Sequence, residues 1–353
     1  MKLPPRCLSI ILLATTTLSA CVKPPADPDD SEDVTATTSG PVGAGGQGGS
    51  GSTSGSGASG GASELQPLEA ATEFDLVFRG TGASGIAGDL YLPARTDPVP
   101  AVLVIHGGGF ITGDKAGAPE VLWSEHLTAN GFAAFSVNYR LIGDFPPGEI
   151  PFSGAIMDLK CAVRWLRGHA ESLRIDPNRI YALGGSAGGF MANFLGTTGD
   201  EPEFSPEDCV EGSASSDRLQ AFVAYYGPSD WNALYNDPLR LGADNGDAKF
   251  LGLDTTAPCA PGSAESSGIC TVASATTYVD PEDPPAFLAH SDDDPTIPLT
   301  QSELMRATLE AAGVDVNYQQ VDGLGHGWHA KFGNDMAVGV RDEAVAFLGA
   351  QGE

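Results

Sequence analysis

The sequence predicts one large α/β domain, with a mostly parallel central sheet and helices on both of its faces. Short apolar runs suited to buried strands alternate with longer helical stretches, which is the rhythm of parallel strands joined by crossover helices. About 290 residues follow the N-terminal region, a length that suits one such domain better than two. No internal repeat interrupts the alternation.

One strand-turn-helix unit carries the pattern Gly-x-Ser-x-Gly at residues 184–188, with Ser186 at its centre. Residues 178–183 before it predict a buried strand, and residues 187–195 after it predict a helix. Glycines on both sides of the serine allow a sharp turn in which larger side chains would clash. A second match at residues 57–61 has no strand or helix around it, so we predict that Ser186 is the nucleophile.

Three consecutive glycines follow the predicted strand at residues 101–105, within the sequence His-Gly-Gly-Gly-Phe at residues 106–110. They lie where a sheet ends and a loop begins, so backbone N–H groups there can approach a ligand oxygen and form an oxyanion hole. Taken alone, the motif is equally well explained as a glycine-rich turn without chemistry. Together with Ser186 it indicates acyl transfer.

Two later segments supply an acid and a histidine at the ends of predicted strands. Strand 285–290 leads into three consecutive aspartates at 292–294, and strand 316–321 leads into a turn that holds His326 between two glycines. A histidine on such a turn suits a proton shuttle better than a packing role, whereas His329 is expected to be a bystander. A cation site is the alternative for the aspartates, but adjacent side chains on a short loop rarely converge on one ion. We therefore predict no metal site.

The stretch from about residue 74 to residue 348 resembles the α/β-hydrolase esterase family, which includes hormone-sensitive-lipase-like enzymes, feruloyl and acetyl-xylan esterases and kynurenine formamidase. The matching pieces are residues 106–110, 113–115, 137–141, 158–167, 175–180 and 184–189. The acid loop of such proteins reads His-Gly-x-x-Asp-x-x-x-Pro, which places the acid on Asp294 and the proline on Pro298. Ser291 stands where the family has glycine.

The resemblance implies the α/β-hydrolase fold and a serine carboxylic ester hydrolase that works through an acyl-enzyme without a cofactor. The implied site consists of Ser186 as nucleophile, His326 as base and Asp294 as orienting acid, with backbone N–H groups of Gly108, Gly109 and Ala187 as the oxyanion hole. The expected substrates are small-molecule esters with short acyl groups or with carbohydrate or aryl parts. An amidase or peptidase of the same fold and a catalytically silent surface or adhesion protein are the alternatives.

The first 20 residues predict an export signal. Lys2 and Arg6 precede an apolar stretch at residues 8–18, which is too short for a membrane span of about twenty residues. Residues 18–21, Leu-Ser-Ala-Cys, resemble a bacterial lipobox, which implies cleavage before Cys21 and lipidation of its thiol. We therefore expect a lipid anchor in the bacterial cell envelope, at the outer membrane or cell surface, with a plain secretory signal as the alternative.

Residues 21–63 predict a disordered tether between the lipidated cysteine and the catalytic domain at residues 64–353. The tether is rich in glycine, serine and threonine, and cannot bury enough apolar surface to offset its ordering entropy. Within the domain, residues 229–284 form an insertion that is either a lid over the active site or a surface loop. The sequence offers no N-terminal cap before residues 106–110, which favours a shallow site and short-acyl substrates.

The chain is strongly acidic, with 46 acidic and 18 basic residues and a formal net charge of −28. Nucleic-acid partners need a basic surface, so the sequence argues against them. Solubility of an exported protein explains this charge. A preference for cationic substrates is the alternative.

Four cysteines belong to the predicted catalytic domain: Cys161, Cys209, Cys259 and Cys270. An even number in an oxidising compartment predicts two disulfides, for which three connectivities exist. Cys161 lies on a predicted helix and Cys209 in a polar insert, whereas Cys259 and Cys270 flank a Ser/Gly-rich loop. We favour the pairs Cys161–Cys209 and Cys259–Cys270. The absence of a Cys-x-x-Cys spacing in the sequence argues against metal binding.

Overall fold

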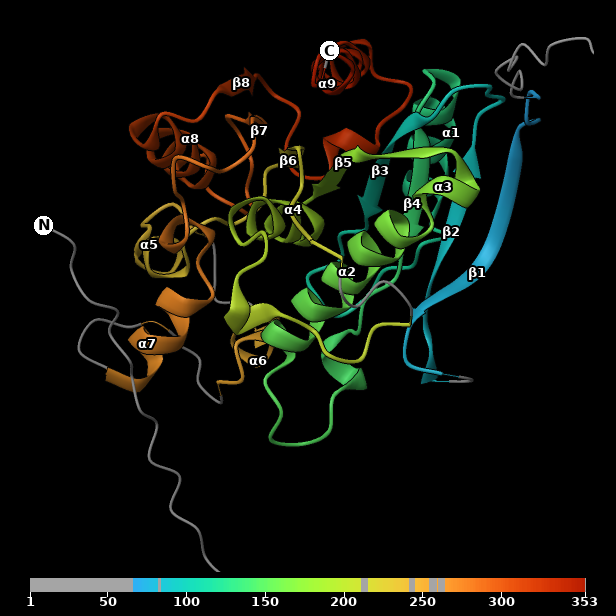
Figure 1. The fold of residues 1–353 in the computed structure, drawn as a ribbon. Coiled ribbons are helices and arrows are strands. Elements are labelled where there is room, and N and C mark those ends of the chain that lie inside the picture. The colour runs from blue at the N-terminus through green and yellow to red at the C-terminus, as the bar shows by residue number, and fades with distance from the viewer. Residues whose placement is uncertain are drawn as a thin grey trace, which may run out of the picture. The chain divides into compact units, whose positions relative to one another are not determined.

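The computed structural model describes residues 66–352, except residues 82–83, 211–214, 241–244, 254–258 and 260–263. The predicted export signal, Cys21 and the predicted tether lie outside these residues. The described chain forms an eight-stranded sheet in the order β1-β2-β4-β3-β5-β6-β7-β8, with helices on both faces (Figure 1). This arrangement confirms the predicted fold class.

The sheet is antiparallel at one edge and parallel over the rest of its width. The strands are β1 (Ala71–Arg79), β2 (Ile86–Leu92), β3 (Val99–Ile105), β4 (Ala133–Val137), β5 (Ile175–Gly185), β6 (Ala221–Tyr225), β7 (Ala286–Ser291) and β8 (Val316–Val321). β1 pairs with β2 and β2 with β4 in antiparallel fashion, whereas every pair from β4 to β8 is parallel. The structure thus contains the strands predicted at residues 101–105, 178–183, 285–290 and 316–321.

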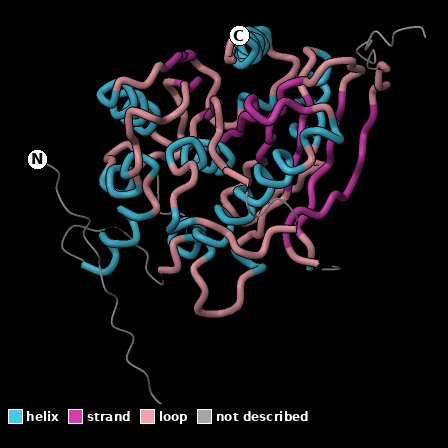
Figure 2. Tube along the Cα trace, viewed as in Figure 1, coloured by secondary structure: helices cyan, strands magenta, loops and turns pink. Residues whose placement is uncertain are grey.

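The helices form one layer on each face of the sheet (Figure 2). They are α1 (Ala118–Ala129), α2 (Pro151–Gly168), α3 (Ala170–Leu173), α4 (Ala187–Thr197), α5 (Trp231–Asn236), α6 (Asn245–Phe250), α7 (Ala264–Val272), α8 (Thr300–Ala312) and α9 (Asp335–Gly349). Buried side chains of α2, α4 and α8 share one apolar cluster, and those of α1 and α9 share a second. None of the helices in the described part of the chain has the length and apolarity that a membrane crossing requires.

The central strands β3, β5 and β6 bring their carboxyl ends together at one edge of the sheet. The register pairs Ile105 at the end of β3 with Gly184 of β5, and pairs Gly185 at the end of β5 with Tyr225 of β6. Loops that follow parallel strands meet at this edge, where ligand sites of open α/β sheets form. The predicted nucleophile turn and the glycine motif therefore begin side by side.

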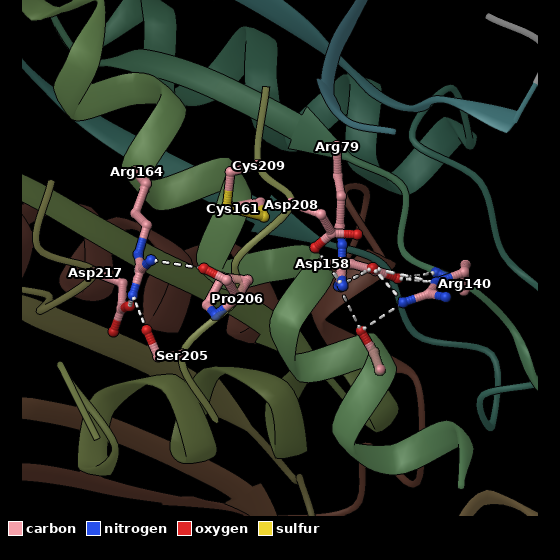
Figure 3. The surroundings of a disulfide bond; sticks show 11 residues. Arg79, Arg140, Asp158, Cys161, Arg164, Ser205, Pro206, Asp208, Cys209 and Asp217 are labelled. Carbon is pink, nitrogen blue, oxygen red and sulfur yellow. Dashed lines mark hydrogen bonds and ion pairs between the residues drawn. A yellow bond between two sulfur atoms is a disulfide. The ribbon is translucent and has the colours of Figure 1, made fainter. Parts of the chain in front are cut away.

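The cysteines lie in the two pairs that we favoured. Cys161 of α2 lies at disulfide distance from Cys209, and Cys259 from Cys270, with Cα separations of 5.1 and 5.8 Å. The segment that carries Cys209 is held further by Arg79, which contacts Asp208 at 2.7 Å and Asp158 of α2 at 2.6 Å (Figure 3). The disulfide and these two ion pairs together hold the segment with Asp208 and Cys209 against α2.

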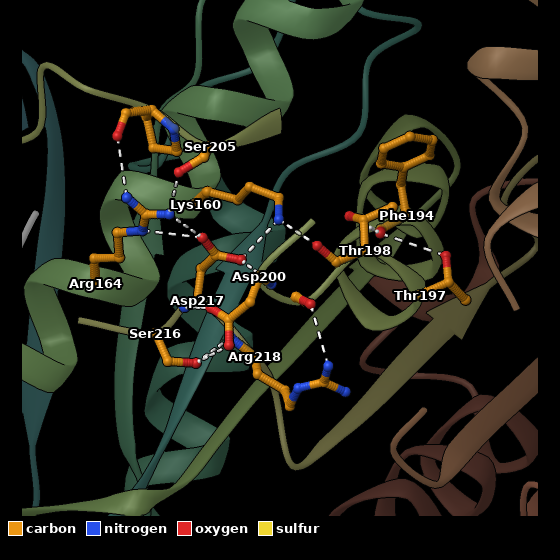
Figure 4. A network of polar contacts seen from close by, with 12 residues as sticks. Lys160, Arg164, Phe194, Thr197, Thr198, Asp200, Ser205, Ser216, Asp217 and Arg218 are labelled. Carbon is orange, nitrogen blue, oxygen red and sulfur yellow. Dashed lines mark hydrogen bonds and ion pairs between the residues drawn. The ribbon is translucent and has the colours of Figure 1, made fainter. Parts of the chain in front are cut away.

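A second buried charge cluster lies on the same helix. The carboxylate of Asp217 accepts hydrogen bonds from Lys160 Nζ at 2.7 Å and from Arg164 Nη2 at 2.6 Å, and also from the backbone N–H of Asp200 at 2.8 Å (Figure 4). Lys160 and Asp217 have fully buried side chains. Buried charges are tolerated when they are paired and hydrogen-bonded. These contacts connect α2 to the chain that follows α4.

Candidate active site

Ser186 lies in the sharp turn between β5 and α4, with φ 58° and ψ −120°. A positive φ is disfavoured for a residue with a side chain, so the surroundings must hold this turn in place. The two flanking glycines leave no room for a Cβ atom. A Cβ on Gly184 would lie 2.4 Å from the carbonyl oxygen of Gly188, and one on Gly188 would lie 2.2 Å from the carbonyl oxygen of Ile105. The pattern Gly-x-Ser-x-Gly is therefore a steric requirement of this turn.

His326 lies between Ser186 and Asp294. Its Nε2 is 2.9 Å from Ser186 Oγ, and its Nδ1 is 2.7 Å from Asp294 Oδ2. The other carboxylate oxygen, Oδ1, accepts hydrogen bonds from the backbone N–H groups of Thr296 and Ile297 at 2.8 and 3.0 Å. The structure thus brings together the three side chains that the resemblance implied.

The Asp294 side chain is fully buried. Burial by itself raises the pKa of this carboxyl, but hydrogen bonds from His290 and His326, together with the charge of His326, hold the pKa well below its usual range. The carboxylate therefore stays ionised at neutral pH. An ionised acceptor on Nδ1 fixes the tautomer in which Nε2 faces Ser186 without a proton.

The other two aspartates of the acid loop have different partners. Asp292 Oδ1 accepts a hydrogen bond from the backbone N–H of Gly323 at 3.0 Å, and Asp293 Oδ1 accepts one from Gly325 at 2.8 Å. The three carboxylates therefore turn to separate donors. Within the described ranges, no group of three or more histidine, cysteine and acidic side chains is arranged to hold a metal ion.

Ser291, which departs from the family glycine, connects the acid loop to the histidine loop. Its hydroxyl accepts hydrogen bonds from the backbone N–H groups of Leu324 and Gly325 at 3.0 and 3.2 Å, and donates one to Asp293 at 2.7 Å. The substitution thus adds contacts that position the turn before His326.

The glycine motif forms a tight turn next to the nucleophile. Gly108 and Gly109 have φ of 108° and 59°, a conformation that favours glycine. The carbonyl oxygen of Gly108 accepts hydrogen bonds from Ile111 and Thr112 at 3.1 and 3.2 Å, which closes the turn. A Cβ on Gly107 would lie 3.5 Å from the Cβ of Ser186, so the start of this loop packs directly against the serine.

Ala187 is the first residue of α4 and immediately follows Ser186. The first backbone N–H groups of a helix have no acceptor within the helix, and they carry the positive end of its dipole. Because α4 begins next to Ser186, these N–H groups lie beside the serine. The turn that contains Gly108 and Gly109 also lies beside it.

Two further residues of the site were not predicted to have a role. The ring of Tyr226, just after β6, lies 4.7 Å from the ring of His326, measured between centroids, and its hydroxyl contacts Nδ1 of His329. Burial, followed by the nearby charges of His326 and Arg341, lowers the pKa of His329 to about 3, so this imidazole is neutral at neutral pH. The position of Tyr226 at the carboxyl end of a central strand is the one sequence signal that points to it.

Ser186 and His326 open into a pocket of about 680 Å³. The described residues that line it are His106, Gly107, Gly108, Gly109, Ile111, Thr112, Gly113, Asp114, Gly117, Pro119, Glu120, Gly185, Ser186, Tyr226, Thr296, His326, Gly327 and His329. The described residues of the insertion at 229–284 are not among them. Its aromatic residues Trp231 and Phe250 are buried and pack near Phe110. The lid interpretation of this insertion stays a prediction.

Comparison with known proteins gives one family and several relatives. The family model described as BD-FAE matches residues 88–309. The probable carboxylic ester hydrolase LipM of Mycobacterium tuberculosis is 30% identical over 210 residues, which are 59% of this chain and 44% of LipM. The chain spans about half the length of the curated relatives it matches.

Two solved structures share the fold. One is a truncated carbohydrate esterase from gut microbiota, with a TM-score of 0.64 and 22% identity over 82% of this chain and 97% of its own. The other is an acetyl ester-xyloside bifunctional hydrolase from Caldicellulosiruptor lactoaceticus, with a TM-score of 0.59 and 25% identity over 75% of this chain and 88% of its own.

Proposed function

This chain belongs to the BD-FAE family of α/β-hydrolase esterases, and on that premise we propose that it is a serine carboxylic ester hydrolase. The observation that carries the proposal is the line of three side chains, with Ser186 Oγ 2.9 Å from His326 Nε2 and His326 Nδ1 2.7 Å from Asp294. Named relatives support it, because LipM is described as a probable carboxylic ester hydrolase.

In the proposed reaction, Ser186 Oγ attacks the carbonyl carbon of the ester while His326 Nε2 takes its proton. The tetrahedral intermediate collapses to an acyl-enzyme, and His326 returns the proton to the departing alcohol. Water then attacks the acyl carbon, with His326 again as the base, and the acid leaves as Ser186 regains its proton. Asp294 stabilises the imidazolium in both halves, because its carboxylate is ionised and bonded to Nδ1.

The oxyanion of both intermediates is assigned to backbone N–H groups of Gly108, Gly109 and Ala187. Two features support this role: the glycine turn packs against Ser186, and α4 begins at the next residue. Donors fixed in this way stabilise developing negative charge without reorganising, and one such donor is typically worth about a hundredfold in rate.

The decisive test is the variant Ser186→Ala. We expect hydrolysis of p-nitrophenyl acetate and labelling by a fluorophosphonate probe to be lost, with the melting temperature nearly unchanged because only one oxygen atom is removed. Ser59→Ala is the matched control, since Ser59 lies at the centre of the second Gly-x-Ser-x-Gly match. More than a few per cent of residual activity in Ser186→Ala would contradict the proposal.

We further assign short-acyl esters as the preferred substrates, including acetylated carbohydrates. Ile111 is the one large aliphatic residue among the described residues that line the pocket. An alkyl chain gains about 0.8 kcal/mol per buried methylene only where an apolar groove receives it. The Caldicellulosiruptor relative is named for an acetyl ester, which agrees with a small acyl group.

A series of p-nitrophenyl esters from acetate to decanoate tests this assignment. We expect kcat/KM to be highest from acetyl to butyryl and to fall by octanoyl, without interfacial activation. A value that rises steadily towards decanoate would instead indicate that residues 229–284 form a lid over a lipid-binding groove.

We also propose that Cys21 is lipidated and anchors the enzyme in the bacterial cell envelope. The support is the sequence Leu-Ser-Ala-Cys at residues 18–21 after a short apolar stretch. The mature protein should partition into detergent, and Cys21→Ser should release it into the aqueous phase. A wild-type protein found free in the medium, with an N-terminus other than modified Cys21, would contradict this anchor.

A further inference from the structure

Glu120 is a buried acid in the pocket of Ser186. It lies in the first turn of α1, is 9% exposed and is one of the residues that line the pocket. In the part of the chain that the structure describes, no lysine, arginine or histidine forms an ion pair with it. A buried carboxylate without a partner of opposite charge is unfavourable unless another group compensates it. The proposed ester hydrolysis does not use this side chain.

The described lining of the pocket contains acidic side chains but no lysine or arginine to balance them. The two acids are Asp114 and Glu120. Lys115 follows Asp114 in the chain, but its Nζ contacts Asp89 at 2.6 Å and Asp75 at 2.9 Å. Among the histidines of the lining, burial lowers the pKa of His106, and His329 has a pKa of about 3.

The carboxylate of Glu120 lies next to the backbone at the start of α1. A Cβ on Gly117, which precedes α1, would lie 2.3 Å from Oε2 of Glu120, so this oxygen lies against the helix N-terminus. The positive end of the helix dipole favours the ionised form there. Desolvation, together with the negative charge of Asp114, has the opposite effect and raises the pKa of Glu120, although a hydrogen bond from the residue's own backbone N–H favours ionisation. A bound cation would compensate the desolvated charge and favour ionisation.

We propose that Glu120 makes this pocket a binding site for an organic cation, so that the enzyme prefers esters whose alcohol carries a substituted ammonium group. The inference rests on the proposed ester hydrolysis and adds a substrate class to it. The net charge of −28 would also draw cations towards the protein at low ionic strength.

The test compares acetylcholine with 3,3-dimethylbutyl acetate, a neutral ester of the same shape in which carbon replaces the quaternary nitrogen. We expect kcat/KM of the wild type to be about tenfold or more higher for acetylcholine, with this ratio falling as salt is added. Glu120→Gln should lower the ratio of the two kcat/KM values by about tenfold. Glu125→Gln, which removes an exposed acid from the same helix, should leave the ratio unchanged.

Two outcomes would overturn the inference. One is a wild-type enzyme that treats the two esters alike, and the other is a Glu120→Gln variant that lowers both values equally, as a purely structural role in α1 predicts. Choline as a competitive inhibitor of p-nitrophenyl acetate hydrolysis gives a second readout on the wild type that needs no variant. Fluorophosphonate labelling of the wild type separates the two proposals, because labelling without cation preference overturns the inference alone.

Discussion

The ring of His329 fills the space beside Gly185 in which a side chain would have to fit. A Cβ on Gly185 would lie 2.5 Å from Cε1 of His329 and 2.7 Å from both ring nitrogens. Gly185 is the residue before Ser186, so the imidazole packs against the nucleophile turn. His329 thus supports the turn by its shape, although it takes no part in the proposed proton transfers.

We expect Gly185→Ala to lower kcat/KM for p-nitrophenyl acetate by about a hundredfold, because displacing a catalytic group by about an ångström has an effect of this size. His329→Ala alone should be far milder than His326→Ala. The double variant Gly185→Ala/His329→Ala should recover part of the lost activity, since the second change frees the space. A double variant that is no better than Gly185→Ala would contradict this steric account.

Asp294→Asn should reduce kcat by about ten-thousandfold, because an amide at this position favours the wrong tautomer of His326. Asp292→Asn and Asp293→Asn should have little effect, since an amide oxygen still accepts the hydrogen bonds from Gly323 and Gly325. Steady-state kinetics on the three variants check the order. If Asp293→Asn were the most damaging, the acid would have to be reassigned.

Acid should destabilise the protein partly through His329. Its pKa is about 3 in the folded protein, against the ordinary histidine value of 6.5. Between these values the unfolded chain binds more protons, so stability is full above about pH 6.5 and falls on acidification, by at most about 1.4 kcal/mol per pH unit for one group. The lowered pKa of Asp294 acts in the same direction at lower pH.

Urea unfolding of the wild type and of His329→Gln at several pH values between 7 and 4 measures this effect. The variant should lose less stability over this range, because glutamine does not titrate. Equal slopes for the two proteins would contradict the assigned pKa.

The two disulfides should differ in their contribution to stability. They join residues 48 and 11 positions apart, for which the loop-entropy relation gives about 4 and about 3 kcal/mol respectively. Replacing Cys161 and Cys209 by alanine should therefore lower the free energy of unfolding more than replacing Cys259 and Cys270. Urea titrations of both double variants test this order. The ion pairs of Arg79 also hold the segment next to Cys209, so they reduce the stability lost when the Cys161–Cys209 disulfide is removed.

The nucleophile turn was predictable because its determinants are local. A buried strand, three small residues and a helix follow each other within residues 178–195, and the steric constraints at Gly184 and Gly188 act over that same stretch. The acid and the histidine came from matching short motifs at strand ends. The structure then places Asp294 and His326 within hydrogen-bonding distance of each other.

Other parts of the site depend on contacts between distant segments. Glu120 and Tyr226 are separated by more than one hundred positions and share a pocket only because β3, β5 and β6 end at the same edge of the sheet. For Tyr226 the one local signal is its position just after a central strand, and the residues around Glu120 carry no such signal. The antiparallel strands β1 and β2 were likewise not predicted. Most residues of β1 are exposed, so the burial of its side chains gives little indication of a strand.

The hydrogen bonds of Ser291, Asp292 and Asp293 join the acid loop to the histidine loop. Because these loops follow the paired strands β7 and β8, the histidine turn cannot open by itself without breaking contacts at the ends of both strands. Local opening of the site is therefore coupled to the cooperative unfolding of the sheet. Heat inactivation should consequently follow global unfolding, so that catalytic half-life and the spectroscopic melting curve report the same event.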